Sequence, residues 1–206
     1  MLTVGKDAAG VEEMLKAGML CCPGCGERLA RWGYARRRRV FGPRRAARAV
    51  RPRRSRCTGC GVTHVLLPAD LMARRADDAA VIGRALADAA RGHGHRRIAA
   101  SLGISPDTVR GGLRRFALAA GRVRVFFTRL ACALSADPVP LDPAGTVLAD
   151  GVVAVAAAAD AAWSRWPAMR AVSAWELASA LTSGSLLSPV VMFRRADAGS
   201  LVSVLA

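Results

Sequence analysis

The sequence contains no uninterrupted apolar run long enough to cross a bilayer. The longest run, Gly151–Ala159, is bounded by Asp150 and Asp160, whereas a membrane helix needs about 20 apolar residues. The N-terminus also has no long apolar core after Lys6, so it does not resemble a signal peptide. These absences predict a protein of the cytoplasm with no membrane partner. Because the cytoplasm is reducing, the cysteines are expected to be metal ligands or buried thiols and not disulfides.

Acidic residues are missing from the most basic part of the chain. Between Arg28 and Arg56 there are thirteen arginines and no aspartate or glutamate. The formal net charge is +16, but residues 136–206 contain four arginines, five aspartates and one glutamate, so the first 135 residues carry +18. A hydrophobic content of 52% argues against a disordered basic tail. Nucleic acid is the expected partner, and a membrane surface, which needs an amphipathic pattern, is the less favoured alternative.

Cysteines form two matching pairs, Cys22-Pro-Gly-Cys25-Gly and Cys57-Thr-Gly-Cys60-Gly. Two residues between the thiols allow both to reach one ion, and the glycine after each pair permits the backbone to curl around the sulfurs. Four thiolates are the ligand set that structural zinc prefers, and they leave no position open for a catalytic water. The spacing predicts a zinc ribbon with one structural Zn²⁺, and the alternative is two unrelated buried pairs.

Three other residues near or beyond the pairs could bind metal or pack. Cys21 is expected to be surplus, with substitution as a ligand the alternative. His64 is expected to pack or form a hydrogen bond beside the ribbon rather than to bind the ion. Cys132 lies far away in the sequence and is expected to be a buried thiol.

The arginine block between the pairs is interrupted by Gly42, Pro43 and Pro52, which favours short strands over a helix. We expect it to contact phosphates through the consecutive arginines Arg36, Arg37, Arg38 and Arg39. The aromatic residues between the arginines, Trp32, Tyr34 and Phe41, are expected to form the small core of the ribbon. The alternative is that they stack on bases, as in single-strand binders.

Residues 77–120 have a helical pattern that is typical of a helix-turn-helix. It predicts helices over Asp77–Ala90 and His95–Leu102, and a third that begins after Ser105. Ser105 is a good N-cap, and the following proline suits the first helical position. The expected core of the three helices is Ile98, Leu102, Ile104, Val109 and Leu113. The alternative is an ordinary helical hairpin.

The third helix is the expected recognition helix, whose first part would enter the major groove. Five of its residues would then face the bases: Ser105, Asp107, Thr108, Arg110 and Arg114. Arg96, Arg97 and Arg115 are expected to contact phosphates and fix the register. Gly111 and Gly112 lie inside this helix, and each costs about 1 kcal/mol relative to alanine.

The whole pattern predicts a mainly α protein with a small β zinc ribbon. The expected segments are an N-terminal helix (1–20), the ribbon (21–72), the helix-turn-helix domain (75–120), a linker (121–145) and a helical C-terminal region (146–206). In the last segment, residues 147–163 are alanine-rich, and Ser173 and Glu176 form a capping-box signature for a helix that ends before Gly184. A homodimer through these C-terminal helices is a further expectation.

Four stretches resemble the N-terminal zinc ribbon of bacterial transposases: Cys22-Pro-Gly-Cys-Gly, Arg31-Trp-Gly, Arg56-Cys-Thr-Gly-Cys and Thr63-His-Val-Leu-Leu-Pro68. With Trp175-Glu-Leu-Ala and Leu181-Thr-Ser-Gly-Ser in the tail, the chain is most similar to an uncharacterised family of high-GC bacteria. The resemblance implies a ribbon, a helix-turn-helix and DNA binding, but no known reaction. The sequence departs from that pattern at Gly112, where a Trp-like residue is typical.

A transposase would also need a catalytic domain with three metal-binding carboxylates. The acids after residue 120 lie in the expected linker, helices and tail: Asp137, Asp142, Asp150, Asp160, Glu176 and Asp197. No alternating strand pattern surrounds them, so we predict no catalysis and no small-molecule substrate. The expected function is a zinc-containing, nucleoid-associated protein that binds duplex DNA, as a transcriptional regulator or a mobile-element accessory protein. The alternatives are an RNA-binding or ribosome-associated ribbon protein and a non-catalytic transposase remnant.

Overall fold

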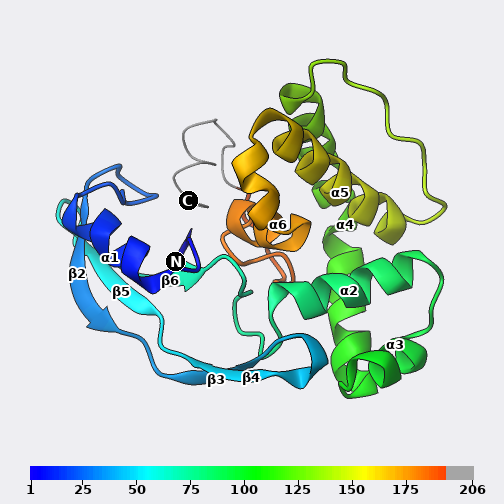
Figure 1. Cartoon of the computed structure of the whole chain (residues 1–206), viewed down its shortest axis with the longest axis horizontal. Helices are drawn as coiled ribbons and strands as arrows, with labels where there is room; N and C mark the ends of the chain where they lie inside the picture. Colours follow the sequence, from blue (N-terminus) through cyan, green and yellow to red (C-terminus); the bar gives the residue numbers. More distant parts are fainter. Residues whose placement is uncertain (194–206) are drawn as a thin grey trace.

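The computed structural model describes residues 1–193 (Figure 1). Its N-terminal part contains β1 (Leu2–Val4), α1 (Ala8–Lys16), β2 (Leu29–Tyr34), β3 (Arg38–Phe41), the 3-10 turn η1 (Pro43–Arg45), β4 (Ala47–Val50), β5 (Arg53–Cys57) and β6 (Thr63–Pro68). Helices α2 (Ala79–Ala90), α3 (His95–Leu102), α4 (Pro106–Leu134), α5 (Val147–Arg165) and α6 (Ala174–Leu181), with η2 (Pro167–Ala171), make up the rest. The predicted fold class, mainly α with a small β part, is confirmed. The end of the predicted region 146–206, with Asp197, lies outside the described residues.

The larger sheet has the strand order β1-β6-β5-β2, with β1 parallel to β6 and the other pairs antiparallel. Helix α1 covers one face of it and buries Val11 and Leu15 against Leu29 and Leu66. Asp7 caps α1 by accepting hydrogen bonds from two backbone amides of the first turn. The sequence predicts only a helix for residues 1–20, so the strand β1 corrects that prediction. Its pairing partner is 64 residues away, and no local pattern reveals it.

Strands β3 and β4 form a separate hairpin whose tip is η1. Val40 is fully buried beside Leu67 and Leu71, which fixes one face of the hairpin against the chain that leaves β6. The amide of Phe41 donates to the carbonyl of Ala76 (2.8 Å), and the carbonyl of Phe41 accepts from the amide of Asp78 (3.0 Å). The predicted strands in the arginine block are therefore present, and the hairpin is hydrogen-bonded to the residues just before α2.

Helices α2, α3 and α4 pack around a small apolar cluster. Ile98 and Val109 are buried in it together with Ala85 and Ala99, and the partly buried Leu102, Ile104 and Leu113 complete it. All five apolar residues predicted for this core are present. Gly103 ends α3 in the left-handed conformation (φ 64°), and the Ser105 hydroxyl accepts a hydrogen bond from the amide of Thr108 (3.2 Å) to begin α4.

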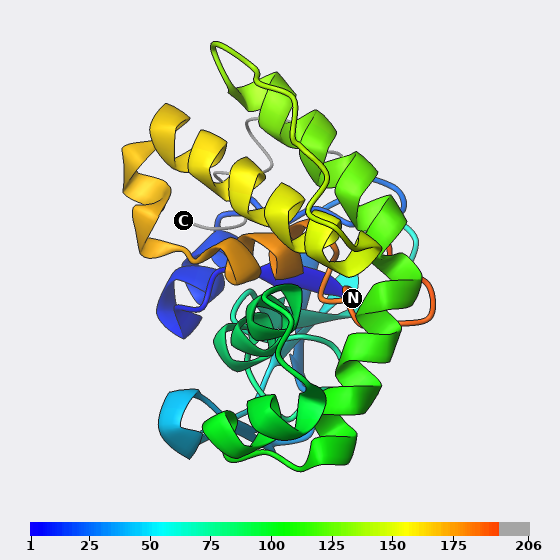
Figure 2. The ribbon, with the colours of Figure 1, turned by 90° about the vertical axis from the view of Figure 1, so that its right-hand side faces the viewer.

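Helix α4 continues to Leu134, so the predicted linker 121–145 is wrong over its first fourteen residues. Within that stretch, Val123, Phe127 and Leu130 recur at helical spacing and are buried against α5 and α6. The connection to α5 is the shorter segment 135–146, which contains three prolines: Pro138, Pro140 and Pro143. Figure 2 shows α4 running the length of the molecule, with α5 packed along its upper half.

The C-terminal helices pack onto the rest of the chain and do not form a separate layer. Gly151 allows α5 to approach α4 closely, because a Cβ there would lie 3.3 Å from the Ala120 carbonyl oxygen. The Trp175 indole of α6 lies directly over Gly83 of α2. Helix α6 begins with the predicted capping box and is followed by Gly184 at φ 72°. The Ser179 hydroxyl donates to the carbonyl of Leu71 (2.6 Å), which ties α6 to the segment after β6.

Helix α5 is long and apolar enough, by length and composition alone, to cross a membrane. The apolar run Gly151–Ala159 is therefore the middle of a longer helix than its length suggests. Its inner face is buried against α4, α2 and α6 through Ala154, Val155 and Ala158. Core helices of folded domains pass the same test of length and composition, so this feature by itself indicates little.

Candidate metal centre and basic surface

The two cysteine pairs form knuckles with the same hydrogen-bond pattern. The amide of Cys22 donates to the Glu27 carbonyl (2.7 Å), and the amide of Cys57 donates to the Val62 carbonyl (2.9 Å). In each knuckle the glycine amide also donates back to the first cysteine carbonyl, at 2.9 Å and 3.2 Å. The glycines, Gly26 and Gly61, have φ values of 80° and 72°. Only glycine adopts this backbone cheaply, which is the curl that the C-x-x-C-G pattern predicts.

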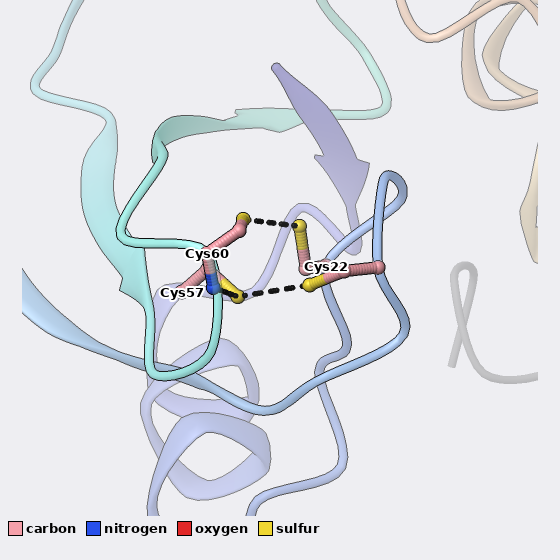
Figure 3. A group of neighbouring side chains, drawn as sticks. Cys22, Cys57 and Cys60 are labelled. Carbon is pink, nitrogen blue, oxygen red and sulfur yellow. Dashed lines mark hydrogen bonds between the residues drawn. The ribbon is translucent and has the colours of Figure 1, made fainter.

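The four sulfurs of Cys22, Cys25, Cys57 and Cys60 lie within 4.8 Å of one another. The Cys22 and Cys60 sulfurs are 3.8 Å apart, and those of Cys25 and Cys57 are 3.3 Å apart. Tetrahedral Zn–S bonds of about 2.3 Å place sulfurs about 3.8 Å from one another, so the donor set fits one zinc-sized ion. Figure 3 shows Cys22 facing Cys57 and Cys60, which come from the opposite knuckle.

The crowded thiols shift one another's pKa values. Hydrogen bonds from backbone amides of its own knuckle lower the pKa of the Cys22 thiol. Burial opposes ionisation of Cys57, but the Cys60 amide and the Cys25 thiol lower its pKa to about 6. The Glu27 amide favours the Cys25 thiolate, yet the adjacent Cys57 thiol and burial raise the pKa of Cys25 to about 12. Four thiolates therefore need a cation between them at neutral pH, and a bound dication supplies it.

His64 is buried beside this centre, and its Nε2 lies 3.4 Å from the Cys22 sulfur. It is not one of the four clustered ligands. The hydrogen bond expected for His64 beside the ribbon is therefore confirmed. A partner of this kind orients a ligand and tunes its basicity without binding the ion.

The two remaining cysteines lie outside the centre. Cys21 is exposed and forms an isolated bridge with Arg28, in agreement with its expected surplus role. Cys132 is also exposed, so the prediction of a buried thiol is wrong. Cys132 lines an open cavity between the end of α4 and α5, whereas its neighbour Leu130 is buried in the core.

Several arginines of the basic block are already paired within the chain. Glu12 of α1 accepts from Arg53 (2.7 Å) and Arg31 (3.0 Å). Asp77 pairs with Arg45 (2.5 Å), and Asp70 pairs with Arg48. Burial raises the pKa of the Asp70 carboxyl, and the Arg48 guanidinium opposes that shift. These acids come from outside the block, so the sequence does not reveal which arginines they neutralise.

Other arginines of the block have no acidic partner within residues 1–193. Arg36, Arg37 and Arg39 are exposed, and Arg38 is half-buried with its Nε and one Nη unpaired. Burial and the Arg48 charge lower the pKa of the Arg38 guanidinium. A cavity of about 370 Å³ on the β3–β4 hairpin is lined by four arginines: Arg37, Arg38, Arg39 and Arg48. This concentration of charge is suited to an anion.

The aromatic residues of the block do not form a common core. Trp32 is 49% exposed and Tyr34 is 50% exposed, so the core interpretation is wrong for these two. Arg56 stacks on Trp32, and Arg53 stacks on Tyr34. Phe41 is partly buried, and Arg45 lies 4.0 Å from the centre of its ring. The bulge in β2 next to Trp32 and the edge position of the strand leave these rings in solvent.

The residues predicted to contact DNA from the helices are exposed on α3 and the first turns of α4. They are Arg96, Arg97, Ser105, Asp107, Thr108, Arg110, Arg114 and Arg115. Arg110 pairs with Asp107 (2.9 Å), and the hydroxyls of Ser105 and Thr108 lie 2.8 Å apart. Four of the five predicted base readers therefore also stabilise the start of α4. Arg114 is in the third turn and has no ion pair within residues 1–193.

The sequence reading missed the position of the hairpin tip. Residues 43–45 contact α3, and the side-chain carbons of Arg45 lie against Gly103 between α3 and α4. In Figures 1 and 2 the tip, α3 and the first turn of α4 lie along the lower edge of the molecule. The basic hairpin and the basic helix ends therefore share one side. The Pro-Arg-Arg turn is visible in the sequence, but its neighbour is not.

Residues 22–102 match the sequence model of a family described as a domain of unknown function (DUF6431). The matched stretch runs from the first cysteine of the metal centre to the last residue of α3. No curated protein and no solved structure matches the chain.

Proposed function

We propose that this protein is a zinc-containing DNA-binding protein, a transcriptional regulator or a mobile-element accessory protein. The observation that supports this most is the shared basic side. The hairpin arginines Arg36, Arg37 and Arg39 and the helical arginines Arg96 and Arg97 are all exposed, and the hairpin tip contacts α3. When a basic surface of this kind neutralises DNA phosphates, the counterions condensed on the DNA are released, and this release favours binding. Duplex DNA presents phosphates on both sides of each groove.

In this proposal α2, α3 and α4 act as a helix-turn-helix, and α4 is the recognition helix. The short turn between α3 and α4 and their common apolar cluster support this. Arg110 and Arg114 would read guanines, since arginine can donate to both major-groove acceptors of that base. Arg115 and the arginines of α3 would contact phosphates.

The metal centre would have a structural role. Four thiolates complete a tetrahedral shell, so no water position remains for catalysis. A bound zinc would fix both knuckles, and with them the ends of β2 and β5, in a unit with a small apolar core. We propose no enzymatic activity.

The test is a gel-shift competition at physiological salt between a pool of random-sequence duplex DNA, single-stranded DNA and structured RNA. Duplex DNA should compete best. An RNA-binding protein is the second candidate, because the half-exposed Trp32 and Tyr34 with their stacked arginines could receive unpaired bases. RNA that outcompetes duplex DNA would refute the first proposal and favour the second.

We also propose that the protein forms a homodimer through its C-terminal helices, since two copies would read two half-sites. Trp163 and Trp175 pack within the chain, so the interface would use exposed residues of α5 such as Val147 and Val153. Light scattering at micromolar concentration, with and without DNA, tests this. A monomeric mass in both samples would remove the proposal.

A further inference from the structure

The tip of the β3–β4 hairpin combines backbone strain with an unused arginine. Arg44 and Arg45 both have positive φ values, 54° and 59°. This left-handed region is unfavourable for residues with a side chain, and glycine or asparagine is the usual occupant. Strain of this kind persists where the rest of the structure imposes it, and it is often found at functional positions.

The two tip arginines differ in what their side chains do. Arg45 pairs with Asp77, stacks on Phe41 and packs on Gly103, so it fastens the tip to the helices. Within residues 1–193, Arg44 has no ion pair, hydrogen bond or aromatic partner, and it is exposed. The Arg44 side chain therefore makes no contact of these kinds that would stabilise the fold. Stability does not explain why an arginine occupies this strained position.

The tip is held rigidly next to the helices. The hydrogen bonds of Phe41 to residues 76 and 78 fix its base, and the buried Val40 anchors the strand before it. Beside these contacts, a cavity of about 400 Å³ is lined by residues of the tip, α2 and α3, among them Arg44, Arg84 and Ser101. Arg44 therefore borders open space on the basic side of the molecule.

The tip lies beside α3 and beside the turn that leads into α4. Helix α3 contacts both the tip and α4, and a packed helix is about 10–12 Å across. The minor groove next to an occupied major groove is centred about half a turn away, or about 17 Å. In the proposed arrangement, a tip next to α3 and Gly103 would be within reach of that minor groove while α4 occupies the major groove.

We infer that Arg44 enters the minor groove beside the major-groove site of α4, and that the hairpin reads a narrow, A·T-rich flank. Arginine is the side chain that the strong negative potential of a narrow minor groove attracts. This inference rests on the proposed function and adds a second element of recognition to it. The preference would depend on the absence of the guanine 2-amino group, which projects into the minor groove.

The test uses the full chain and the best-bound duplex selected from a random-sequence pool. Its flank is rebuilt once with G·C pairs and once with inosine·C pairs, which lack the minor-groove amino group and present the same major-groove edge as G·C pairs. The wild type should bind the inosine duplex more tightly. Arg44→Gly should bind about ten-fold more weakly, lose the preference for inosine, and unfold at an equal or higher temperature because the strain is relieved.

Arg74→Gly is the matched control. Arg74 is exposed with a φ of 58°, and the amide of the preceding residue, Ala73, bonds to Gly184 in the C-terminal region. The Arg74→Gly variant should unfold at the wild-type temperature or above it. It should keep the wild-type affinity for duplex DNA and the preference for the inosine duplex. Equal weakening by Arg44→Gly and Arg74→Gly, or a wild type that ignores inosine, would overturn the minor-groove inference and leave DNA binding intact. A wild type that binds no duplex would refute the proposed function itself.

Discussion

Gly83→Ala tests how closely the C-terminal region packs against α2. A Cβ at position 83 would lie 2.0 Å from Cδ1 and 2.1 Å from Cγ of Trp175, so the indole or the helix must move. Alanine is favoured over glycine in a helix by about 1 kcal/mol, but overpacking a core costs about 1–3 kcal/mol, or more where neighbours cannot move. Trp175 is held by the capping-box turn of α6 and by the main core. We expect a net loss of about 1–2 kcal/mol and a fall in Tm of about 2–8 °C.

Gly121→Ala is the control for helix propensity. Gly121 lies in α4, is exposed, and a Cβ there would meet nothing within 4 Å. It should raise Tm by about 2–4 °C. Both variants are compared by circular dichroism melts, and Gly83→Ala is repeated in a Trp175→Ala background, where its cost should disappear. The proposed clash with Trp175 is wrong if Gly83→Ala melts at or above the wild-type temperature. It is also wrong if Gly83→Ala lowers the melting temperature equally in the Trp175→Ala background.

Three further predictions concern the metal and DNA sites. Elemental analysis should find one zinc per chain, which Cys57→Ser loses and Cys132→Ser retains; equal loss from both would contradict the ligand assignment. His64→Leu should weaken metal affinity by about 10–100-fold in a chelator competition, and an unchanged affinity would exclude its supporting role. Arg37→Ala should weaken binding to all duplexes and reduce the salt slope by about 0.9, whereas Arg110→Ala should reduce discrimination between sequences. Identical effects from the two arginine variants would contradict the division between phosphate and base contacts.

Features that depend on a few neighbouring residues could be predicted from the sequence. The knuckles follow from the C-x-x-C-G spacing, because their hydrogen bonds close within five residues. The starts of α4 and α6 follow from Ser105 and Ser173, whose side chains bond to amides three residues later. The apolar cluster of α2, α3 and α4 follows from helical periodicity.

The errors arose where distant segments decide the outcome. The prediction of a linker over 121–134 is wrong although Val123, Phe127 and Leu130 recur at helical spacing, because these residues are buried only where α5 packs on α4. The prediction of a core position for Trp32 is wrong because β2 is an edge strand, and the indole is exposed there. The exposure of Cys132 depends on which face of α4 the other helices cover.

The convergence of four thiols and the positive charge of the first 135 residues follow from the sequence alone, because spacing and composition are local properties. Which arginines remain available to a partner depends on how the chain folds, because acids from outside the basic block neutralise four of them: Arg31, Arg45, Arg48 and Arg53. The tertiary structure also brings the hairpin tip beside α3, through the contact of Arg45 with Gly103. Pairings over such separations depend on how the elements pack, and a local pattern does not encode them.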